Sequence, residues 1–248
     1  MLTGDTRRAA VLGSPIAHSL SPVLHGAACR ALGLSDWVYD SHDVRESALR
    51  GFVAGLGPEW AGLSLTMPLK EAGFEIADEV SDLAREVGAI NTLVRRPDGG
   101  WSVENTDVYG VSQALREAGC LHVASSLVLG SGATARSVVA ALATLGCKKV
   151  TFAARSDARP ETLDQARRAG LEVDVVGLGK VSQVMQRIGD APVVVSTLPG
   201  LRRCEARRRP WSAARLDRLE PGDRLGSRRL RDRGTHRRHP ASDPAGEP

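Results

Sequence analysis

The sequence predicts an α/β protein with an N-terminal α/β substrate domain and a Rossmann-like domain on a parallel sheet. Apolar runs alternate with helical patterns between residues 9 and 196. Residues 125–156 read as strand, glycine turn, helix and strand, which opens a dinucleotide-binding fold. Apolar periodicity stops after residue 200, which truncates the second domain. We expect a substrate-binding domain at 1–106, a nucleotide-binding domain at 107–200 and a tail at 201–248.

The expected substrate domain begins with a strand at 9–12 and a helix that opens at Ser21-Pro22. Serine suits a helix N-cap, and proline suits the first turn of a helix. Asp98-Gly99-Gly100 predicts the turn of a hairpin within 88–105. Between these features the patterns predict a strand at 37–43, a helix at 46–54, a strand at 63–66 and a helix at 68–77.

A helix at 107–118 is expected to lead into the nucleotide-binding domain. Its first strand ends at Gly130, and the helix that follows repeats apolar residues on one face. The second strand covers 150–154. A helix near 160–169, a strand at 171–176, a helix near 181–188 and a strand at 193–196 complete the expected domain.

The glycine turn has the spacing of a phosphate-binding loop. Gly130 permits a tight turn, Gly132 leaves no side chain between the backbone and a pyrophosphate, and Ala135 lets the helix pack closely on the strand. The helix N-terminus offers free N–H groups to the phosphates. A purely structural turn is the alternative interpretation.

The end of the second strand favours NADP over NAD. NAD-binding proteins usually place an acidic residue there, about twenty residues past the first glycine, to hold the ribose 2′-hydroxyl. Here the position holds Arg155 and Ser156, with Arg159 just beyond. A guanidinium matches a 2′-phosphate in charge and in geometry. A solvated arginine at a strand end is the alternative.

Four polar clusters lie upstream, each at or after the end of an expected strand, where α/β folds place ligand-binding groups. They are residues 13–22, 62–70, 88–93 and 105–110, with Ser19, Ser21, Thr66, Lys70, Asn91, Asn105 and Asp107 as the candidate side chains. Hydroxyls, amides, one lysine and one carboxylate suit a small polyhydroxylated acid. Singly, each has a structural explanation: Ser21 and Asp107 as helix caps, Lys70 as a solvated lysine. His18 and His25 are expected to be structural.

In combination these motifs resemble the shikimate dehydrogenase family, over about residues 8–200. The likeness rests on HSLSP, T-x-P-x-K, G-A-x-N-T-L, N-T-D and the glycine loop. It implies NADP-dependent reduction of 3-dehydroshikimate to shikimate, in aromatic amino-acid biosynthesis. The implied catalytic pair is Lys70 as acid/base with Asp107.

The same resemblance implies the binding residues. Ser19 and Ser21 would bind the substrate carboxylate, and Thr66, Asn91 and Asp107 would hold its hydroxyls. The cofactor residues would be Gly130, Ser131, Gly132, Ala133, Thr134 and Ala135 around the pyrophosphate, Arg155, Ser156 and Arg159 at the 2′-phosphate, and Thr197.

The sequence also departs from the family pattern. Ser64 and Ala154 stand where the family often has asparagine. After Gly200 the family's further strand, its D-x-x-Y-x-P-x-x-T-P-L motif and its glutamine-bearing helix are not recognisable. Residues 201–248 contain no Val, Ile, Phe, Tyr, Met or Lys. We expect this Arg- and Pro-rich tail to be disordered, with the composition of a message read out of frame. A crippled or non-catalytic relative that binds NADP or a metabolite therefore stays open as an alternative.

Charge and composition indicate which classes of binding partner to expect. Of the 33 basic residues 14 lie in 201–248, with 7 of the 29 acidic residues, so the preceding 200 residues are mildly acidic. We therefore expect no nucleic-acid binding. No apolar run is long enough for a bilayer, no signal peptide opens the chain, and the four cysteines are scattered. These features predict a cytoplasmic protein without a membrane partner or a metal. A monomer or homodimer is expected, and the sequence does not distinguish the two.

Overall fold

The computed structural model describes residues 6–198 and confirms the predicted α/β class. By its internal contacts the chain divides into two units, Met1–Leu201 and Arg202–Pro248, and the fold below is that of the first. It holds a six-stranded sheet and a four-stranded sheet. The tail predicted at 201–248 lies outside the described residues. The predicted domain boundary at residue 106 stays a prediction.

The first sheet is mixed. Its strands are β1 (Arg7–Gly13), β2 (Trp37–Asp43), β3 (Trp60–Leu65), β4 (Glu79–Val80), β5 (Thr92–Arg95) and β6 (Trp101–Glu104), in the order β2-β1-β3-β5-β6-β4. Strands β1, β2 and β3 are parallel, whereas β5 is antiparallel to both β3 and β6. The β5–β6 pair is the predicted hairpin. Strand β4 lies at the edge beyond this pair and is parallel to β6.

The helices of this part are α1 (Ser21–Ala31), α2 (Glu46–Ala54), α3 (Leu69–Ala72) and α4 (Asp82–Val87), with a 3-10 helix, η1, at Gly73–Ile76. Leu49 and Val53 of α2 pack with Leu63 and Leu65 of β3 in one buried cluster. Alternate residues of β3 therefore face this core, as the period of a strand requires.

The structure of this part differs from the sequence expectations at three places. The helix expected at 68–77 is instead a short α-helix, α3, that ends at Ala72, and the 3-10 helix η1 follows it. Strand β4 and helix α4 were not predicted, because elements of two and six residues are too short to show a period. Ser21 is the first residue of α1 and not its N-cap, since Leu20 holds that position.

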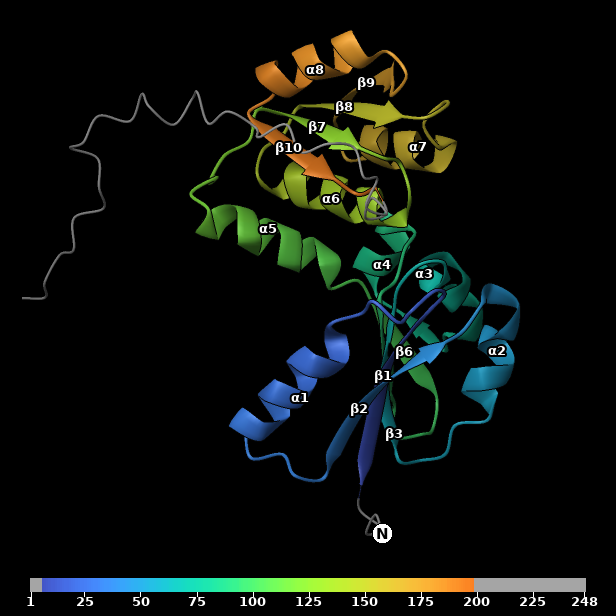
Figure 1. Ribbon diagram of the computed structural model, residues 1–248. Helices are drawn as coiled ribbons and strands as arrows, with labels where there is room; N and C mark the ends of the chain where they lie inside the picture. Colours follow the sequence, from blue (N-terminus) through green and yellow to red (C-terminus); the bar gives the residue numbers. More distant parts are fainter. Residues whose placement is uncertain (1–5, 199–248) are drawn as a thin grey trace, which may run out of the picture. The chain divides into compact units, whose positions relative to one another are not determined.

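The second sheet is fully parallel, in the order β10-β7-β8-β9 (Figure 1). Its strands are β7 (Ser125–Leu129), β8 (Lys149–Ala154), β9 (Glu172–Gly177) and β10 (Val193–Ser196). Its helices are α5 (Asp107–Glu117), α6 (Ala133–Thr144), α7 (Pro160–Arg168) and α8 (Val181–Asp190). Among the described residues β10 is an edge strand, paired only with β7.

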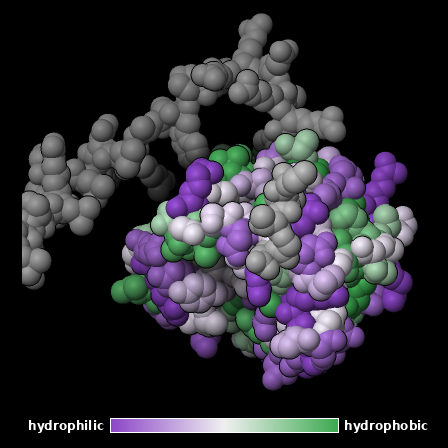
Figure 2. Space-filling model, turned by 90° about the horizontal axis from the view of Figure 1, so that it is seen from below, coloured by the Kyte–Doolittle hydropathy of each residue, from purple (hydrophilic) through white to green (hydrophobic). Residues whose placement is uncertain are grey.

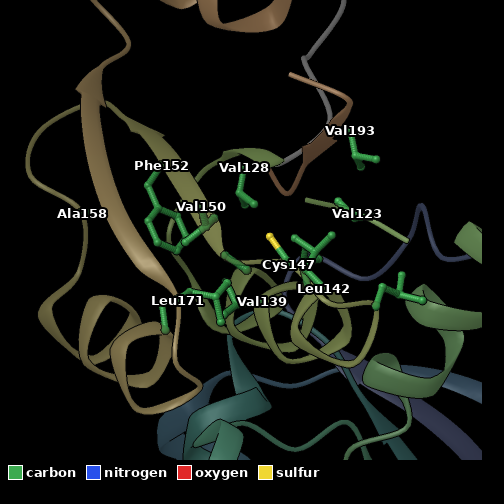
Figure 3. Packing of buried hydrophobic residues seen from close by; sticks show 14 of the residues in the cluster. Val123, Val128, Val139, Leu142, Cys147, Val150, Phe152, Ala158, Leu171 and Val193 are labelled. Atoms are coloured by element: carbon green, nitrogen blue, oxygen red, sulfur yellow. The ribbon is translucent and has the colours of Figure 1, made fainter. Parts of the chain in front are cut away.

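Helices cover both faces of this sheet. Val128, Val150 and Phe152 pack with Val139 and Leu142 of α6 in the largest apolar cluster (Figure 3). The alternate strand residues Leu127 and Ala153 pack instead with Val184 of α8, which lies on the opposite face in Figure 1. Because α6 is buried from Ala135 to Leu142, the glycine turn before it is held firmly at the end of β7.

The surface seen in Figure 2 carries hydrophobic residues in separate groups among hydrophilic ones. Part of the apolar surface lies on and beside α1, where Leu20, Val23 and Leu24 are exposed. None of the helices in the described part of the chain is long and apolar enough to cross a membrane.

Candidate active site

A cavity of about 510 Å³ lies where the glycine turn, the end of β8 and the segment before α3 meet. Glu46, Met67, Pro68, Glu71, Ala154, Asp157 and Leu198 line it without having been predicted. The predicted site residues that line it are Thr66, Lys70, Gly130, Ser131, Gly132, Ala133, Thr134, Arg155, Ser156, Arg159 and Thr197. Residues that follow β3 of the first sheet and residues that follow β7, β8 and β10 of the second therefore share one cavity.

Gly130 stands at the sharpest point of the glycine turn. Its φ of +99° lies in a region that L-residues rarely adopt, and a Cβ there would lie 2.7 Å from Thr197 Oγ1. The Thr197 backbone N–H and hydroxyl both donate to Leu129 O, at 2.9 Å each. The turn and the residue after β10 thus lie in close contact, and only glycine fits between them.

Gly132 has a different environment. A Cβ built on Gly132 would meet nothing within 4 Å, and Gly132 lines the cavity. Gly132 is also the N-cap of α6, whose first turn receives no side-chain cap. The first N–H groups of a helix have no partner within it and carry partial positive charge. The open space beside this helix end suits an anion.

Ala135 does not line the cavity. It is fully buried and packs in the core between α6 and the sheet. This is the close helix–strand packing that its small size permits.

The loop after β8 and the start of α7 are each tied to the glycine turn by one hydrogen bond. The Arg159 N–H donates to Ser131 Oγ at 3.1 Å, and the Thr162 hydroxyl donates to Ser131 O at 2.7 Å. Arg155 and Ser156 are exposed in this loop and line the cavity. Two arginines, Arg155 and Arg159, therefore line the same cavity as the turn.

Lys70, Asp107 and Asn91 form a hydrogen-bonded group. Lys70 Nζ donates to Asp107 Oδ2, and Asn91 Nδ2 donates to Asp107 Oδ1 at 2.7 Å. Asn91 is itself fixed, because its Oδ1 accepts the Thr106 N–H at 2.9 Å. The lysine side chain is 13% exposed and the aspartate 25%. Both carboxylate oxygens of Asp107 have a partner, and the lysine that it holds is among the residues that line the cavity.

Ser19 and Ser21 lie at the start of α1, and neither lines the cavity. The Ser21 N–H donates to Ser19 Oγ at 3.3 Å. His25, expected to be structural, stacks on Tyr39 with ring centroids 3.9 Å apart. The Tyr39 hydroxyl donates to Ser64 Oγ at 2.8 Å, and burial raises the pKa of this tyrosine.

Asn105, another candidate amide, has a buried structural position. It is 3% exposed and donates to Ala89 O at 2.8 Å and to Ser137 Oγ at 2.9 Å. Its side-chain oxygen accepts the Val108 N–H at 3.2 Å, near the start of α5. The side chain thus joins α5, α6 and the loop before β5, and is not free to bind a substrate.

An ion pair beside the cavity, between Glu71 and Arg136, was not predicted. Arg136 of α6 has a 4% exposed side chain and donates to Glu71 Oε1 at 2.5 Å and to Gly88 O at 2.7 Å. Arg159 Nη1 donates to the other Glu71 oxygen at 3.2 Å. Burial raises the pKa of Glu71, but the hydrogen bond and charge of Arg136, with those of Arg159, outweigh it and leave this pKa below its ordinary value. A single arginine in the apolar sequence of α6 was the available signal.

Among residues 6–198 no three or more His, Cys, Asp or Glu side chains gather as metal ligands would. The described cysteines, Cys29, Cys120 and Cys147, are all free thiols.

Residues 11–93 match the family model of the shikimate dehydrogenase substrate binding domain. The NADP(+) shikimate dehydrogenase of Methanothermobacter thermautotrophicus is 35% identical over 204 residues, which cover 80% of this chain and 70% of the relative. The chain belongs to the shikimate dehydrogenase family.

Other members of the shikimate dehydrogenase family agree in sequence and in fold. The NADP(+) enzyme of Thermosynechococcus vestitus is 41% identical over 160 residues, but the match spans only 55% of its length and 64% of this chain. The solved shikimate 5-dehydrogenase of Thermus thermophilus, in complex with NADP(H) and shikimate, has a TM-score of 0.65 and 35% identity. That comparison covers 78% of this chain and 69% of the solved one. The predicted family resemblance is thereby confirmed.

Proposed function

We propose that this chain reduces 3-dehydroshikimate to shikimate with NADPH. The observation that carries the proposal is Lys70, which lines the same cavity as the glycine turn and whose ammonium donates to Asp107. It is supported by relatives named NADP(+) shikimate dehydrogenases and by a related structure with NADP(H) and shikimate bound.

The residues around the cavity fit NADP. The open space at Gly132 and the uncapped start of α6 suit the pyrophosphate, with Ser131, Ala133 and Thr134 beside it. Arg155 and Arg159, with Ser156, suit a 2′-phosphate, since guanidinium groups bind phosphates bidentately. No acidic residue takes the place of Arg155 at the end of β8, where NAD-binding proteins usually carry one.

In the proposed reaction the chain supplies binding and a proton. Ser19 and Ser21 bind the substrate carboxylate, and Thr66, Asn91 and Asp107 hold its hydroxyls. When bound, NADPH supplies the hydride. Reduction of a ketone builds negative charge on its oxygen, and Lys70 donates a proton there. Asp107 holds the lysine within reach, and Asn91 keeps the aspartate oriented through its second oxygen.

The test is oxidation of NADPH by purified protein on addition of 3-dehydroshikimate. Oxidation that requires both compounds and is lost in Lys70→Ala supports the proposal. The same assay with 3-dehydroquinate would show whether the protein also accepts a quinate-type substrate.

The second candidate is binding of NADP or a metabolite without turnover. One observation favours it: the match spans only 55% of the Thermosynechococcus vestitus enzyme and 70% of the Methanothermobacter thermautotrophicus enzyme. NADPH binding by calorimetry, together with no oxidation, would select this candidate. A cytoplasmic location and a monomeric or homodimeric state are part of the proposal and stay predictions.

A further inference from the structure

Glu71 occupies an unusual position, because its two carboxylate oxygens are shared between two arginines. Oε1 accepts from Arg136 at 2.5 Å, and Oε2 accepts from Arg159 at 3.2 Å. Glu71 also lines the cavity, as do Arg155 and Arg159. A negative charge is thus paired with Arg159, one of the two arginines that suit a phosphate.

Arg136 anchors this carboxylate. Its side chain is 4% exposed and binds Gly88 O at 2.7 Å as well as Glu71. Moving Glu71 away would leave a buried guanidinium without its counter-charge, which is costly. Arg159 is the freer partner, since its side chain is 55% exposed. When an anion competes for Arg159, the arginine therefore moves and Glu71 stays.

We propose that Glu71 is a specificity-determining residue that weakens recognition of the cofactor 2′-phosphate by holding the guanidinium of Arg159 in an ion pair. This inference rests on the proposed function, in which Arg159 binds that phosphate. Glu71 thereby limits the preference for NADP over NAD, and the size of this limit is set by the Glu71–Arg159 ion pair. The pyrophosphate end of the site, at Gly132 and α6, is not affected.

The expected effect is modest. Exposed ion pairs contribute roughly 0.2–1 kcal/mol, so releasing Arg159 should tighten binding of a 2′-phosphate by up to about fivefold. Glu71→Gln is the matching change, because the amide has the same shape and its oxygen still accepts from Arg136. The effect should shrink as salt is added, since exposed charges are screened.

The experiment measures binding by calorimetry with adenosine 2′,5′-bisphosphate and, separately, with 5′-AMP, which lacks the 2′-phosphate. Glu71→Gln should tighten the bisphosphate about two- to fivefold and leave 5′-AMP unchanged. In an Arg159→Ala background the same substitution should have no effect. Glu75→Gln is the matched control, because it removes one charge from the neighbouring η1 turn, where Glu75 faces Arg50 instead.

An unchanged or weaker bisphosphate affinity in Glu71→Gln would overturn the inference, as would equal tightening of 5′-AMP or tightening that persists without Arg159. Glu71→Asp is a second variant in case the first does not fold: its shorter side chain cannot reach both arginines, so it should also tighten the bisphosphate. If the unmutated protein binds 5′-AMP as tightly as adenosine 2′,5′-bisphosphate, the proposed NADP site is contradicted together with this inference.

Discussion

Replacing Gly130 by alanine should destabilise the protein through the backbone and not through lost contacts. The φ of Gly130 is +99°, which an alanine tolerates poorly. Its Cβ would stand 2.7 Å from Thr197 Oγ1 and 3.3 Å from Leu198 Cδ2. To make room, Thr197 would have to give up the hydrogen bond from its hydroxyl to Leu129 O. The substitution therefore strains the turn and loosens the end of β10.

The two effects can be added. An unfavourable backbone conformation costs about 1–3 kcal/mol, and a lost hydrogen bond about 1 kcal/mol. A total of about 2–4 kcal/mol corresponds to a fall in Tm of roughly 5–15 °C for a chain of this size. Thermal unfolding followed by circular dichroism measures it directly.

Gly132→Ala is the matched control two residues away. Its φ is −85° and a Cβ there meets nothing within 4 Å, so Tm should stay within about 2 °C. The added methyl group projects into the space proposed for the pyrophosphate, so NADPH binding should weaken about tenfold or more. Equal Tm values for the two variants would refute the reasoning from backbone geometry.

Three further predictions concern the charged residues. Lys70→Ala should lower kcat by about two to four powers of ten with less effect on KM, and Asp107→Asn should lower kcat/KM; a change confined to KM would make Lys70 a binding residue only. Arg155→Ala should reduce the preference for NADP over NAD by about tenfold or more, and equal kcat/KM for the two cofactors before mutation would contradict the assignment. The pKa of Glu71 lies below its ordinary value of 4.5, so the stability it adds is present above pH 4.5 and is lost as pH falls through the lower folded value. Glu71→Gln should flatten the fall of Tm in that acidic range; an unchanged pH profile would show that the ion pairs of Glu71 add no stability.

The second sheet and its glycine turn could be predicted because their signals are local. The strands β7 and β8 are short apolar runs, as buried parallel strands are, and the glycine turn has a fixed spacing. Lys70, Asn91 and Asp107 were expected to act together through the family resemblance, and they meet in the structure although 37 residues separate the lysine from the aspartate. The roles assigned to them stay predictions.

Contacts between residues that are far apart in the sequence could not be predicted from a local pattern. The ion pair between Glu71 and Arg136 joins residues 65 apart, and nothing in either segment specifies the other. The hydrogen bonds of Asn105 are equally non-local, so an amide that looked available for substrate is instead buried between α5 and α6. Packing of one segment on another decides such cases, and a single sequence does not encode it as a period.

The most direct test of the proposed function is the rate of NADPH oxidation with 3-dehydroshikimate, compared between the unmutated protein and Lys70→Ala. The account predicts oxidation that depends on 3-dehydroshikimate and falls by at least about a hundredfold in the variant, while both proteins bind NADPH equally. Tight NADPH binding by the unmutated protein with no oxidation, or equal rates for the two proteins, would contradict it.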